Sequence, residues 1–215
     1  MSGLFITIEG PDGAGKSSVI KELANIIEAN SQIPVILTRE PGGIPISEEI
    51  RKIILDPKNT MMDERTEALL YAAARRQHLI EKIIPNLEEN NLVLCDRFID
   101  SSIAYQGGAR GIGEQEIREI NEFAIEGRWP DLTLYLDIDA KTGLERIAKG
   151  REVSVIDRLD QESLAFHELV RETYLMGLEK EPERIFLIDA SRTIEEVTKA
   201  CYDLIKEQFP GLFVN

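Results

Sequence analysis

Residues 10–17 contain the pattern that most directly indicates chemistry. They read Gly-Pro-Asp-Gly-Ala-Gly-Lys-Ser, which satisfies Gly-x-x-x-x-Gly-Lys-[Ser/Thr], and they follow an apolar run at residues 4–8. The glycines allow a tight turn whose amide N–H groups point at a polyphosphate. Lys16 adds a positive charge, Ser17 offers a hydroxyl to a magnesium ion, and a helix starting here directs its positive end at the same phosphates. The alternative is an ordinary glycine-rich turn. The predicted nucleotide site comprises Gly10, Pro11, Asp12, Gly13, Ala14, Gly15, Lys16, Ser17 and Ser18.

A magnesium ion at such a loop also needs a carboxylate, and the expected place is the end of a neighbouring buried strand. Asp96 follows the apolar run at residues 92–95 and fits this place. Its alternative role is a solvent-facing strand end. Glu9 is a second candidate, for the water shell of the metal, although its position next to the glycines is also suited to fixing the shape of the loop.

Five arginines lie in or beside the loops and short helices expected at the carboxyl ends of strands. They are Arg39, Arg51, Arg75, Arg97 and Arg110. A guanidinium group binds phosphate through two parallel N–H groups, so arginine is favoured where an anion must be oriented as well as neutralised. Any single arginine of this set is more often a surface residue than a ligand. Arg97 is the strongest candidate by position, because it directly follows Asp96.

The composition narrows the classes of protein that the chain can belong to. Its 215 residues suit a single domain spanning residues 1–215, and 43% hydrophobic with 30% charged residues is typical of a globular protein. The sequence has no apolar run near the ~18 residues that cross a membrane. A formal charge of −14 argues against nonspecific binding to nucleic acid or to anionic membranes. Residues 1–10 lack the features of a signal peptide, and we therefore expect a cytoplasmic protein.

The cysteine and histidine content excludes other chemistry. Cys95 and Cys201 lie in an expected strand and an expected amphipathic helix, which favours two buried thiols over a disulfide or a metal pair. His78 and His167 are the two histidines of the sequence, too few for a histidine-rich metal site.

Apolar strand patterns alternate with helical patterns along the whole chain. We expect strands at 4–9, 33–37, 92–95, 132–136 and 185–188. We expect helices at 15–28, 47–55, 63–89 with a bend at Pro85, 114–126, 141–148, 158–179 and 193–207, and a helical turn at 101–105 closed by a flexible glycine loop at 107–111. This alternation predicts an α/β fold with a five-stranded parallel sheet and helices on both faces. The apolar tail at 210–215 suits docking on the body of the protein or on a partner.

Several longer motifs, found in order over nearly the whole chain, carry a family resemblance. They are residues 5–18, Thr-Arg-Glu-Pro-Gly-Gly at 38–43, Leu-Tyr-Ala-Ala-Ala-Arg at 70–75, Asp-Arg-Phe-Ile-Asp-Ser-Ser-Ile-Ala-Tyr-Gln-Gly at 96–107 and Arg-Leu-Asp-Gln-Glu at 158–162. Together they resemble the bacterial-type thymidylate kinases of the P-loop nucleoside monophosphate kinase superfamily. The phosphate loop alone indicates the superfamily, whereas Arg-Glu-Pro-Gly-Gly followed by Asp-Arg-x-x-x-Ser-Ser-x-Ala-Tyr-Gln is specific to the family.

The resemblance implies a reaction and a set of site residues. It implies transfer of a phosphoryl group from ATP to dTMP with Mg²⁺, a step of dTTP synthesis, by a homodimer with a P-loop kinase fold. Arg97 is implied to hold the acceptor phosphate, with Arg39 and Arg51 close by. Tyr71 stands where the family usually has a phenylalanine stacked on thymine, and Tyr105 would lie under the sugar and exclude a 2′-hydroxyl. The base contacts are implied to come from Arg75 at O4 and from Ser102 and Gln106, and Glu40 and Pro41 complete the substrate set. For the two tyrosines, a core aromatic and a loop anchor remain alternatives.

One departure concerns the charge at the transferring phosphoryl group. Some family members carry an arginine within the phosphate loop, where this chain has Gly13. Residues 149–158 resemble the mobile lid of the family, so Lys149, Arg151 or Arg146 is the expected replacement, and we place Arg151 in the catalytic set with Lys16, Asp96 and Arg97. An exposed loop with incidental charges remains the alternative. Arg192 matches a loop that lies along adenine in the family.

The acceptor chemistry needs no general base. A phosphate monoester has a second pKa of about 6, so it is mostly a dianion at neutral pH. The site must instead overcome repulsion between two anions and align them, a task for lysine, arginine and magnesium. Another nucleoside monophosphate kinase is the first rival. A nucleotide-dependent switch is the second, and the Asn-Lys-x-Asp motif that such a protein uses to read guanine is missing from the sequence.

Overall fold

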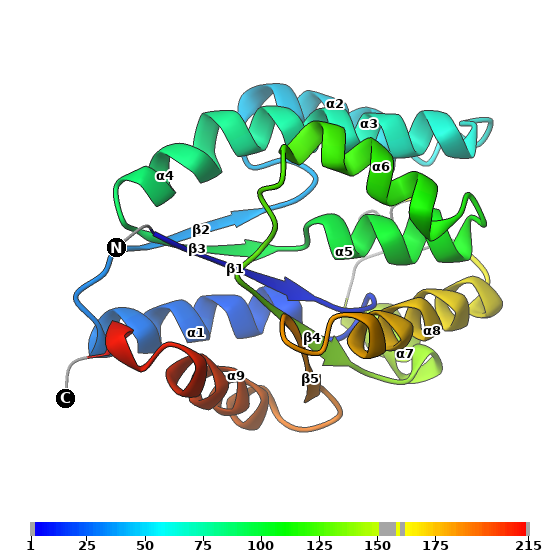
Figure 1. Cartoon of the computed structure of the whole chain (residues 1–215). Helices are drawn as coiled ribbons and strands as arrows, with labels where there is room; N and C mark the ends of the chain where they lie inside the picture. Colours follow the sequence, from blue (N-terminus) through cyan, green and yellow to red (C-terminus); the bar gives the residue numbers. More distant parts are fainter. Residues whose placement is uncertain (1–2, 151–157, 160–161, 214–215) are drawn as a thin grey trace.

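The computed structural model describes residues 3–150, 158–159 and 162–213. Within this part, the strands are β1 (Leu4–Glu9), β2 (Val35–Arg39), β3 (Leu92–Asp96), β4 (Leu132–Asp137) and β5 (Ile185–Asp189). They form one parallel sheet in the order β2-β3-β1-β4-β5. The parallel five-stranded sheet predicted from the alternation is confirmed. Because β1 pairs with both β3 and β4, the loop after β1 opens at the centre of the carboxyl edge of the sheet (Figure 1).

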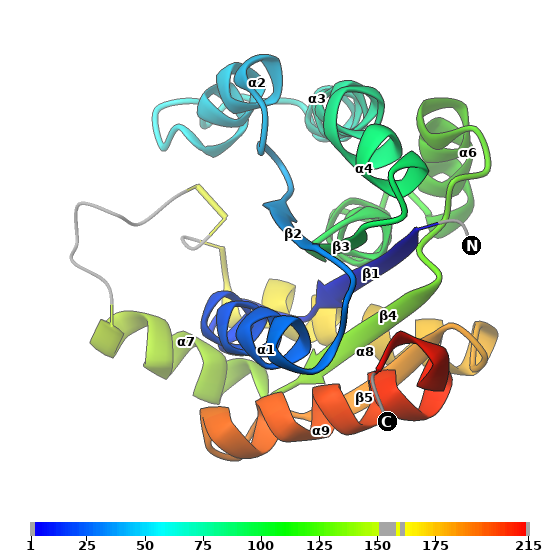
Figure 2. The same cartoon turned by 90° about the vertical axis from the view of Figure 1, so that its left-hand side faces the viewer.

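The helices connect the strands and cover both faces of the sheet (Figures 1 and 2). They are α1 (Lys16–Asn30), α2 (Pro45–Leu55), α3 (Glu64–His78), α4 (Ile84–Glu88), α5 (Ile99–Ser102), α6 (Glu114–Ile125), α7 (Ala140–Gly150), α8 (Leu164–Lys180) and α9 (Ile194–Gln208). A capping box starts α9, with the Thr193 and Glu196 side chains each accepting a hydrogen bond from the other's backbone N–H. A π-helical segment, Leu79–Ile83, links α3 to α4. Pro85 explains it, since a proline ring needs a wider turn before it in a continuing helix.

Alternate residues of the central strands point to opposite faces and build separate cores. Ile6, Ile8 and Leu134 belong to the core under α1 and α9, whereas Phe5, Val93 and Cys95 belong to the core under α4, α5 and α6. All of them are completely buried. Helices cover both faces of the sheet, so a strand residue is buried whichever face it points to. These strands are therefore apolar almost throughout.

Two predictions about local structure are wrong. The glycine loop expected at 107–111 is largely helical, since the π-helical segment Ile103–Ala109 includes the first glycines. A Cβ on Gly108 would lie 1.9 Å from the Thr173 hydroxyl oxygen, so this glycine allows close packing against α8. The helix expected from residue 158 begins instead at Leu164, where the Ser163 hydroxyl accepts a hydrogen bond from the Phe166 N–H.

The remaining predictions concern the cysteines and the tail. Cys95 and Cys201 are buried free thiols, as expected. Phe213 of the C-terminal tail packs against Tyr202 in the core under α1 and α9, with ring centroids 5.2 Å apart, so this part of the tail docks on the body of the protein.

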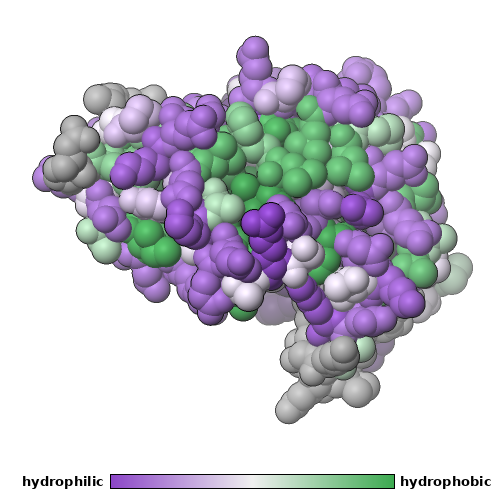
Figure 3. Space-filling view, turned by 90° about the horizontal axis from the view of Figure 1, so that it is seen from below, coloured by the Kyte–Doolittle hydropathy of each residue, from purple (hydrophilic) through white to green (hydrophobic). Residues whose placement is uncertain are grey.

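In the described part of the chain, every helix is too short or too polar to span a membrane. Seen from the side of α1 and α9, the surface is mostly hydrophilic around a smaller hydrophobic area (Figure 3).

Candidate active site

The glycine-rich turn between β1 and α1 has the backbone that its sequence predicts. Gly10, Gly13 and Gly15 adopt φ angles of 141°, 81° and 85°, a range that side-chain-bearing residues rarely use. A Cβ on Gly10 would lie 2.5 Å from the Leu136 carbonyl oxygen, so the turn also packs tightly against β4. Gly15 starts α1 without a side-chain cap. The amides of Lys16 and Ser17 in the first turn of α1 are therefore available to an anion, whereas the Ser18 N–H donates to the Gly15 carbonyl oxygen at 3.1 Å.

Lys16 lies over this turn. Its ammonium group donates hydrogen bonds to the carbonyl oxygens of Gly10 and Pro11, both at 2.9 Å, and the residue is buried. Burial and the nearby positive charge of Arg97 lower the pKa of Lys16 to about 8, while Asp12 acts in the opposite direction. Lys16 thus carries a charge that is poorly compensated within the protein, which favours an anionic ligand.

Ser17 and Asp96 come together from segments far apart in the sequence. The Ser17 hydroxyl donates to Asp96 Oδ2 at 2.9 Å, so the last residue of β3 meets the first turn of α1. A hydroxyl and a carboxylate are oxygen ligands of the kind that Mg²⁺ takes at such a loop. The two residues therefore fit the magnesium site that the sequence indicates.

Glu9 is placed differently. It is completely buried under the turn, where its carboxylate accepts hydrogen bonds from the Phe98 N–H at 2.7 Å, from the Tyr174 hydroxyl at 2.8 Å and from the Ser101 hydroxyl. Burial and the nearby Asp100 carboxylate raise the pKa of Glu9 above its ordinary value. These contacts favour the role in fixing the loop over the role in the water shell of a metal.

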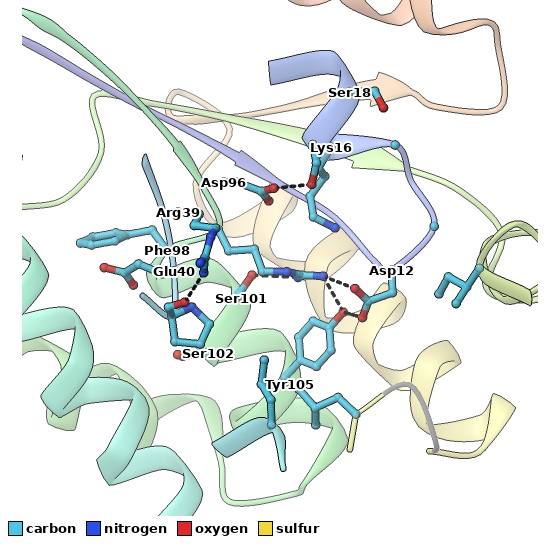
Figure 4. Close-up of a pocket in the computed structure, with 18 of the residues that line it drawn as sticks. Asp12, Lys16, Ser18, Arg39, Glu40, Asp96, Phe98, Ser101, Ser102 and Tyr105 are labelled. Carbon is cyan, nitrogen blue, oxygen red and sulfur yellow. Dashed lines mark hydrogen bonds and ion pairs between the residues drawn. The ribbon is translucent and has the colours of Figure 1, made fainter. Parts of the chain in front are cut away.

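Asp12 pairs with Arg97, and its side chain lies beside the Tyr105 hydroxyl in the pocket (Figure 4). Arg97 Nη2 donates to Asp12 Oδ1 at 2.7 Å and to the Tyr105 hydroxyl at 3.2 Å, and that hydroxyl donates to Asp12 Oδ2 at 2.8 Å. The guanidinium carbon lies 5.0 Å from the centroid of the Tyr105 ring. Burial would raise the pKa of Asp12, but the charges of Arg97 and Lys16 hold it below its ordinary value. Arg97 itself has a φ angle of 68°, so its backbone is held in a strained conformation at the end of β3.

A second cluster forms around Arg75, which is 1% exposed. Its guanidinium group donates to Glu40 at 2.8 Å, to the Ser102 hydroxyl at 3.1 Å, to the Phe98 carbonyl oxygen at 2.9 Å and to Asn121. Four of its five N–H groups are thereby accounted for, which leaves one on Nη2 for a ligand. Glu40 is held from its other oxygen by His78 Nδ1 at 3.0 Å.

The other predicted arginines occupy the rim. Arg39 and Arg51 each donate to the Pro41 carbonyl oxygen at 2.9 Å, and Arg39 also pairs with Glu48 at 2.8 Å. Arg192 pairs with Asp189 at 3.1 Å and is well exposed. Arg146 bonds the carbonyl oxygens of residues 190 and 191. Arg151 lies outside the described residues, as does the side chain of Lys149.

One cavity of about 780 Å³ connects these groups. Every residue of the predicted acceptor set lines it: Arg39, Glu40, Pro41, Arg51, Tyr71, Arg75, Arg97, Ser102, Tyr105 and Gln106. Lys16, Ser17, Ser18, Asp96 and Arg192 line it too, so the nucleotide loop and the acceptor set share one space. Glu9, Gly10, Pro11 and Ala14 are not among the residues that line this cavity.

Sequence reasoning missed two features of this site. Asp12 was assigned to the nucleotide loop, yet its side chain turns toward Arg97 and Tyr105 on the acceptor side. Ser101 links Arg97 Nη1 at 3.1 Å to Glu9 and Tyr174. The sequence could have indicated Ser101, because it is one of the two serines in the motif at 96–107. Tyr174 lies in an ordinary helical pattern, which gives no indication of a role in the site.

Fold and site together define a protein with the P-loop nucleotide-binding fold, whose cavity is lined by the glycine-rich loop and by several arginines. The family model described as thymidylate kinase matches residues 8–201. The chain is 58% identical over 213 residues to the thymidylate kinase of Enterococcus faecalis, covering 99% of this chain and 100% of that one. It is 56% identical over 211 residues to that of a Geobacillus species, covering 98% and 100%. The crystal structure of thymidylate kinase from Ehrlichia chaffeensis superposes with a TM-score of 0.76 at 30% identity, covering 95% and 100%. The chain belongs to the thymidylate kinase family, and it is a nucleotide kinase.

Proposed function

We propose that this chain transfers the γ-phosphoryl group of ATP to dTMP with Mg²⁺, giving ADP and dTDP in the synthesis of dTTP. The observation that carries this proposal is the single cavity of about 780 Å³ that holds the phosphate loop and the Arg97 cluster, in a chain of the thymidylate kinase family. Two anions bound at these places would face each other across a space lined by Lys16 and Arg97. Such positioning and charge neutralisation are what phosphoryl transfer requires.

Each part of the site has a role in this proposal. The amides at residues 10–18 and the Lys16 ammonium hold the triphosphate, and Arg192 lies along the adenine. Arg97 orients the acceptor phosphate, assisted by Arg39 and Arg51. Ser17 and Asp96 would hold magnesium, which supplies charge neutralisation between the phosphates. Arg151, from the proposed lid at 149–158, would add the positive charge that Gly13 does not provide.

The base end of the cavity gives the proposed acceptor specificity. Arg75 keeps one N–H of Nη2 for a carbonyl oxygen of the base, and Tyr71, partly buried beside the core around Tyr105, provides a ring on which a base can stack. Ser102 and Gln106 address the edge of the base. Tyr105 is 4% exposed and packed edge-on against Phe166 at 6.1 Å, which supports the proposal that its fixed ring excludes a 2′-hydroxyl.

We also propose a cytoplasmic homodimer in which residues 1–215 form one domain. Exposed apolar side chains gather on the outer helices α2, α3 and α6 and on the segment after α3, which lie together at the top of Figure 1: Ile46, Ile53, Leu69, Ile80 and Phe123, the last 88% exposed. A second copy of the chain would cover them. Light scattering of the wild type and of Phe123→Asp tests this, with a dimer expected for the first and a monomer for the second.

The proposed location in the cytoplasm is supported by the two free thiols, Cys95 and Cys201, because the cytoplasm is a reducing compartment.

One assay tests the proposed reaction. The protein is incubated with ATP, Mg²⁺ and one nucleoside monophosphate at a time, and ADP and the diphosphate are measured. We expect rapid phosphorylation of dTMP and slow phosphorylation of cytidine, adenosine and guanosine monophosphates. A preference for one of the latter would identify the rival kinase. Transfer to none of them would identify a nucleotide-dependent switch.

A further inference from the structure

Glu67 of α3 is a buried carboxylate that joins three separate segments of the chain. It is 1% exposed, and its Oε1 accepts a hydrogen bond from Gln106 Nε2 at 2.7 Å. Its Oε2 accepts from Arg110 Nη2 at 3.3 Å and from Arg158 Nη2. These donors stand 39, 43 and 91 residues away in the sequence. The contacts of Glu67 therefore depend on the tertiary structure, and Glu67 is not itself among the residues that line the cavity.

The carboxylate dictates the orientation of the Gln106 side chain. An ionised carboxylate only accepts hydrogen bonds, so the amide nitrogen of Gln106, and not its oxygen, must face Glu67. Gln106 lines the cavity and is otherwise buried, and among the described residues its side-chain oxygen, Oε1, receives no hydrogen bond. That oxygen is left to meet a ligand, as a fixed hydrogen-bond acceptor.

The chemistry of the pyrimidine bases makes this orientation selective. Thymine and uracil carry an N–H donor at N3, whereas cytosine has an unprotonated acceptor at the same position. A fixed acceptor pairs with the first two and faces cytosine with an unsatisfied lone pair, which is costly in a buried site. If the Gln106 amide were free to turn over, it would offer its NH₂ group to cytosine instead.

We propose that Glu67 is a positioning residue that sets the base specificity of the acceptor pocket by locking the Gln106 amide. This inference rests on the proposed function and deepens it. The same carboxylate also bonds Arg158, whose neighbour Leu159 lines the cavity. Arg110 is itself shared between Glu67 and Glu162, at 3.3 and 2.7 Å, which holds the network in one arrangement.

The test replaces Glu67 by glutamine, which has the same shape but can donate as well as accept. In Glu67→Gln we expect the ratio of kcat/KM for dTMP to that for dCMP to fall at least about tenfold, because the Gln106 amide can then turn over. This loss of preference should appear as a higher KM for dTMP, with KM for ATP unchanged. The ratio of dTMP to dUMP should stay as in the wild type, since both bases carry the same N3–H donor.

Matched variants separate this role from a general loss of structure. Asp137→Asn removes a carboxylate that also holds an arginine, Arg171 at 2.8 Å, outside the cavity lining, and it should leave both ratios unchanged. Arg158→Gln keeps the bond between Glu67 and Gln106, so it should retain the preference for dTMP over dCMP. Gln106→Met removes the amide and should lose that preference, which provides a test even if Glu67→Gln does not fold.

Calorimetric binding of dTMP and dCMP, without ATP, keeps the inference separate from the proposed reaction. Tighter binding of dTMP by the wild type, lost in Glu67→Gln, supports the inference. Equal loss of affinity for both nucleotides, an unchanged ratio in Glu67→Gln, or an unchanged ratio in Gln106→Met would overturn it. Absence of dTMP phosphorylation by the wild type would overturn the proposed function, while these binding ratios would still decide the role of Glu67.

Discussion

The guanidinium group of Arg97 and the carboxylate of Asp12 lie 2.7 Å apart, although 85 residues separate them in the sequence. Asp12 belongs to the turn after β1, and Arg97 directly follows β3, the neighbouring strand. The register of these two strands places their carboxyl ends side by side, so the nucleotide loop holds the residue proposed to orient the acceptor.

We predict that Asp12→Asn weakens acceptor binding more than ATP binding. The amide keeps the shape of the carboxylate but not its charge, so Arg97 loses the ion pair that orients it, and KM for dTMP should rise roughly tenfold. Because the pKa of Asp12 lies below its ordinary value, the pair persists throughout the neutral range and the effect should not vary there with pH. Steady-state kinetics with each substrate varied measure this. The exposed pair of Lys199 and Asp203 provides the control, and Asp203→Asn should change neither KM.

Tyr105 should discriminate against ribonucleotides through its ring and not through its hydroxyl. Tyr105→Phe keeps the packing against Phe166 and the face under Arg97, so it should retain the preference for dTMP over its ribose counterpart. Tyr105→Ala removes the ring and should lower that preference about tenfold or more. The ratio of kcat/KM for the two nucleotides is the measurement, and equal ratios in the alanine variant and the wild type would exclude the ring from this role.

Lys16 should give the reaction an alkaline limit. Its pKa is lowered to about 8, so in the free protein the ammonium group loses its proton as the pH rises through this value, and kcat/KM for ATP should fall. In the complex the triphosphate favours the charged form, so kcat should fall at a higher pH. The same shift affects stability. Between about pH 8 and the ordinary pKa of 10.5, the unfolded chain binds more protons than the folded one, so the unfavourable contribution of Lys16 to stability becomes smaller as the pH rises.

Lys16→Ala should abolish the fall of kcat/KM for ATP at alkaline pH. It should also lower kcat by about 10²-fold or more with the fold retained. A kcat/KM for ATP that stays level up to about pH 9.5 would contradict the lowered pKa of Lys16.

Ser17→Ala should raise the Mg²⁺ concentration that the reaction requires. The hydroxyl that bonds Asp96 at 2.9 Å is lost, and the half-saturating Mg²⁺ concentration should rise roughly tenfold while activity recovers in part at high Mg²⁺. A titration of activity with Mg²⁺ at saturating ATP and dTMP measures this shift. Ser18→Ala, one residue further along α1, should leave the Mg²⁺ titration as in the wild type.

Two glycines of the loop should differ in what an added methyl group costs. Gly13 and Gly15 both have left-handed backbones, so Gly15→Ala should lower the free energy of unfolding by about 1–2 kcal/mol through strain alone. A Cβ at Gly15 would meet no described atom within 4 Å, whereas one at Gly13 would lie 2.1 Å from the Gly143 carbonyl oxygen in α7. Gly13→Ala should therefore cost clearly more, as measured by chemical denaturation, and equal losses would show that α7 gives way.

The sequence alone determined the parts that depend on local pattern. Alternating apolar strands and amphipathic helices predicted the five-stranded parallel sheet, and the spacing of Gly10, Gly13, Gly15 and Lys16 predicted the loop. The failures occurred where packing overrides local preference. Gly107 and Gly108 read as a flexible loop, but Gly108 lies in a helical segment because its missing side chain admits Thr173 of α8.

Only the tertiary structure decided how the charged residues are paired. A sequence shows that Glu9, Asp12 and Glu67 are acidic, but not which arginine or hydroxyl each one meets, because their partners lie between 39 and 165 residues away. Strand order places Asp12 against Arg97, and the packing of α3 against the segment at 103–109 places Glu67 against Gln106. Hydrogen bonds and ion pairs depend on distances of about 3 Å that local periodicity does not specify, so these contacts emerge only when distant segments pack together.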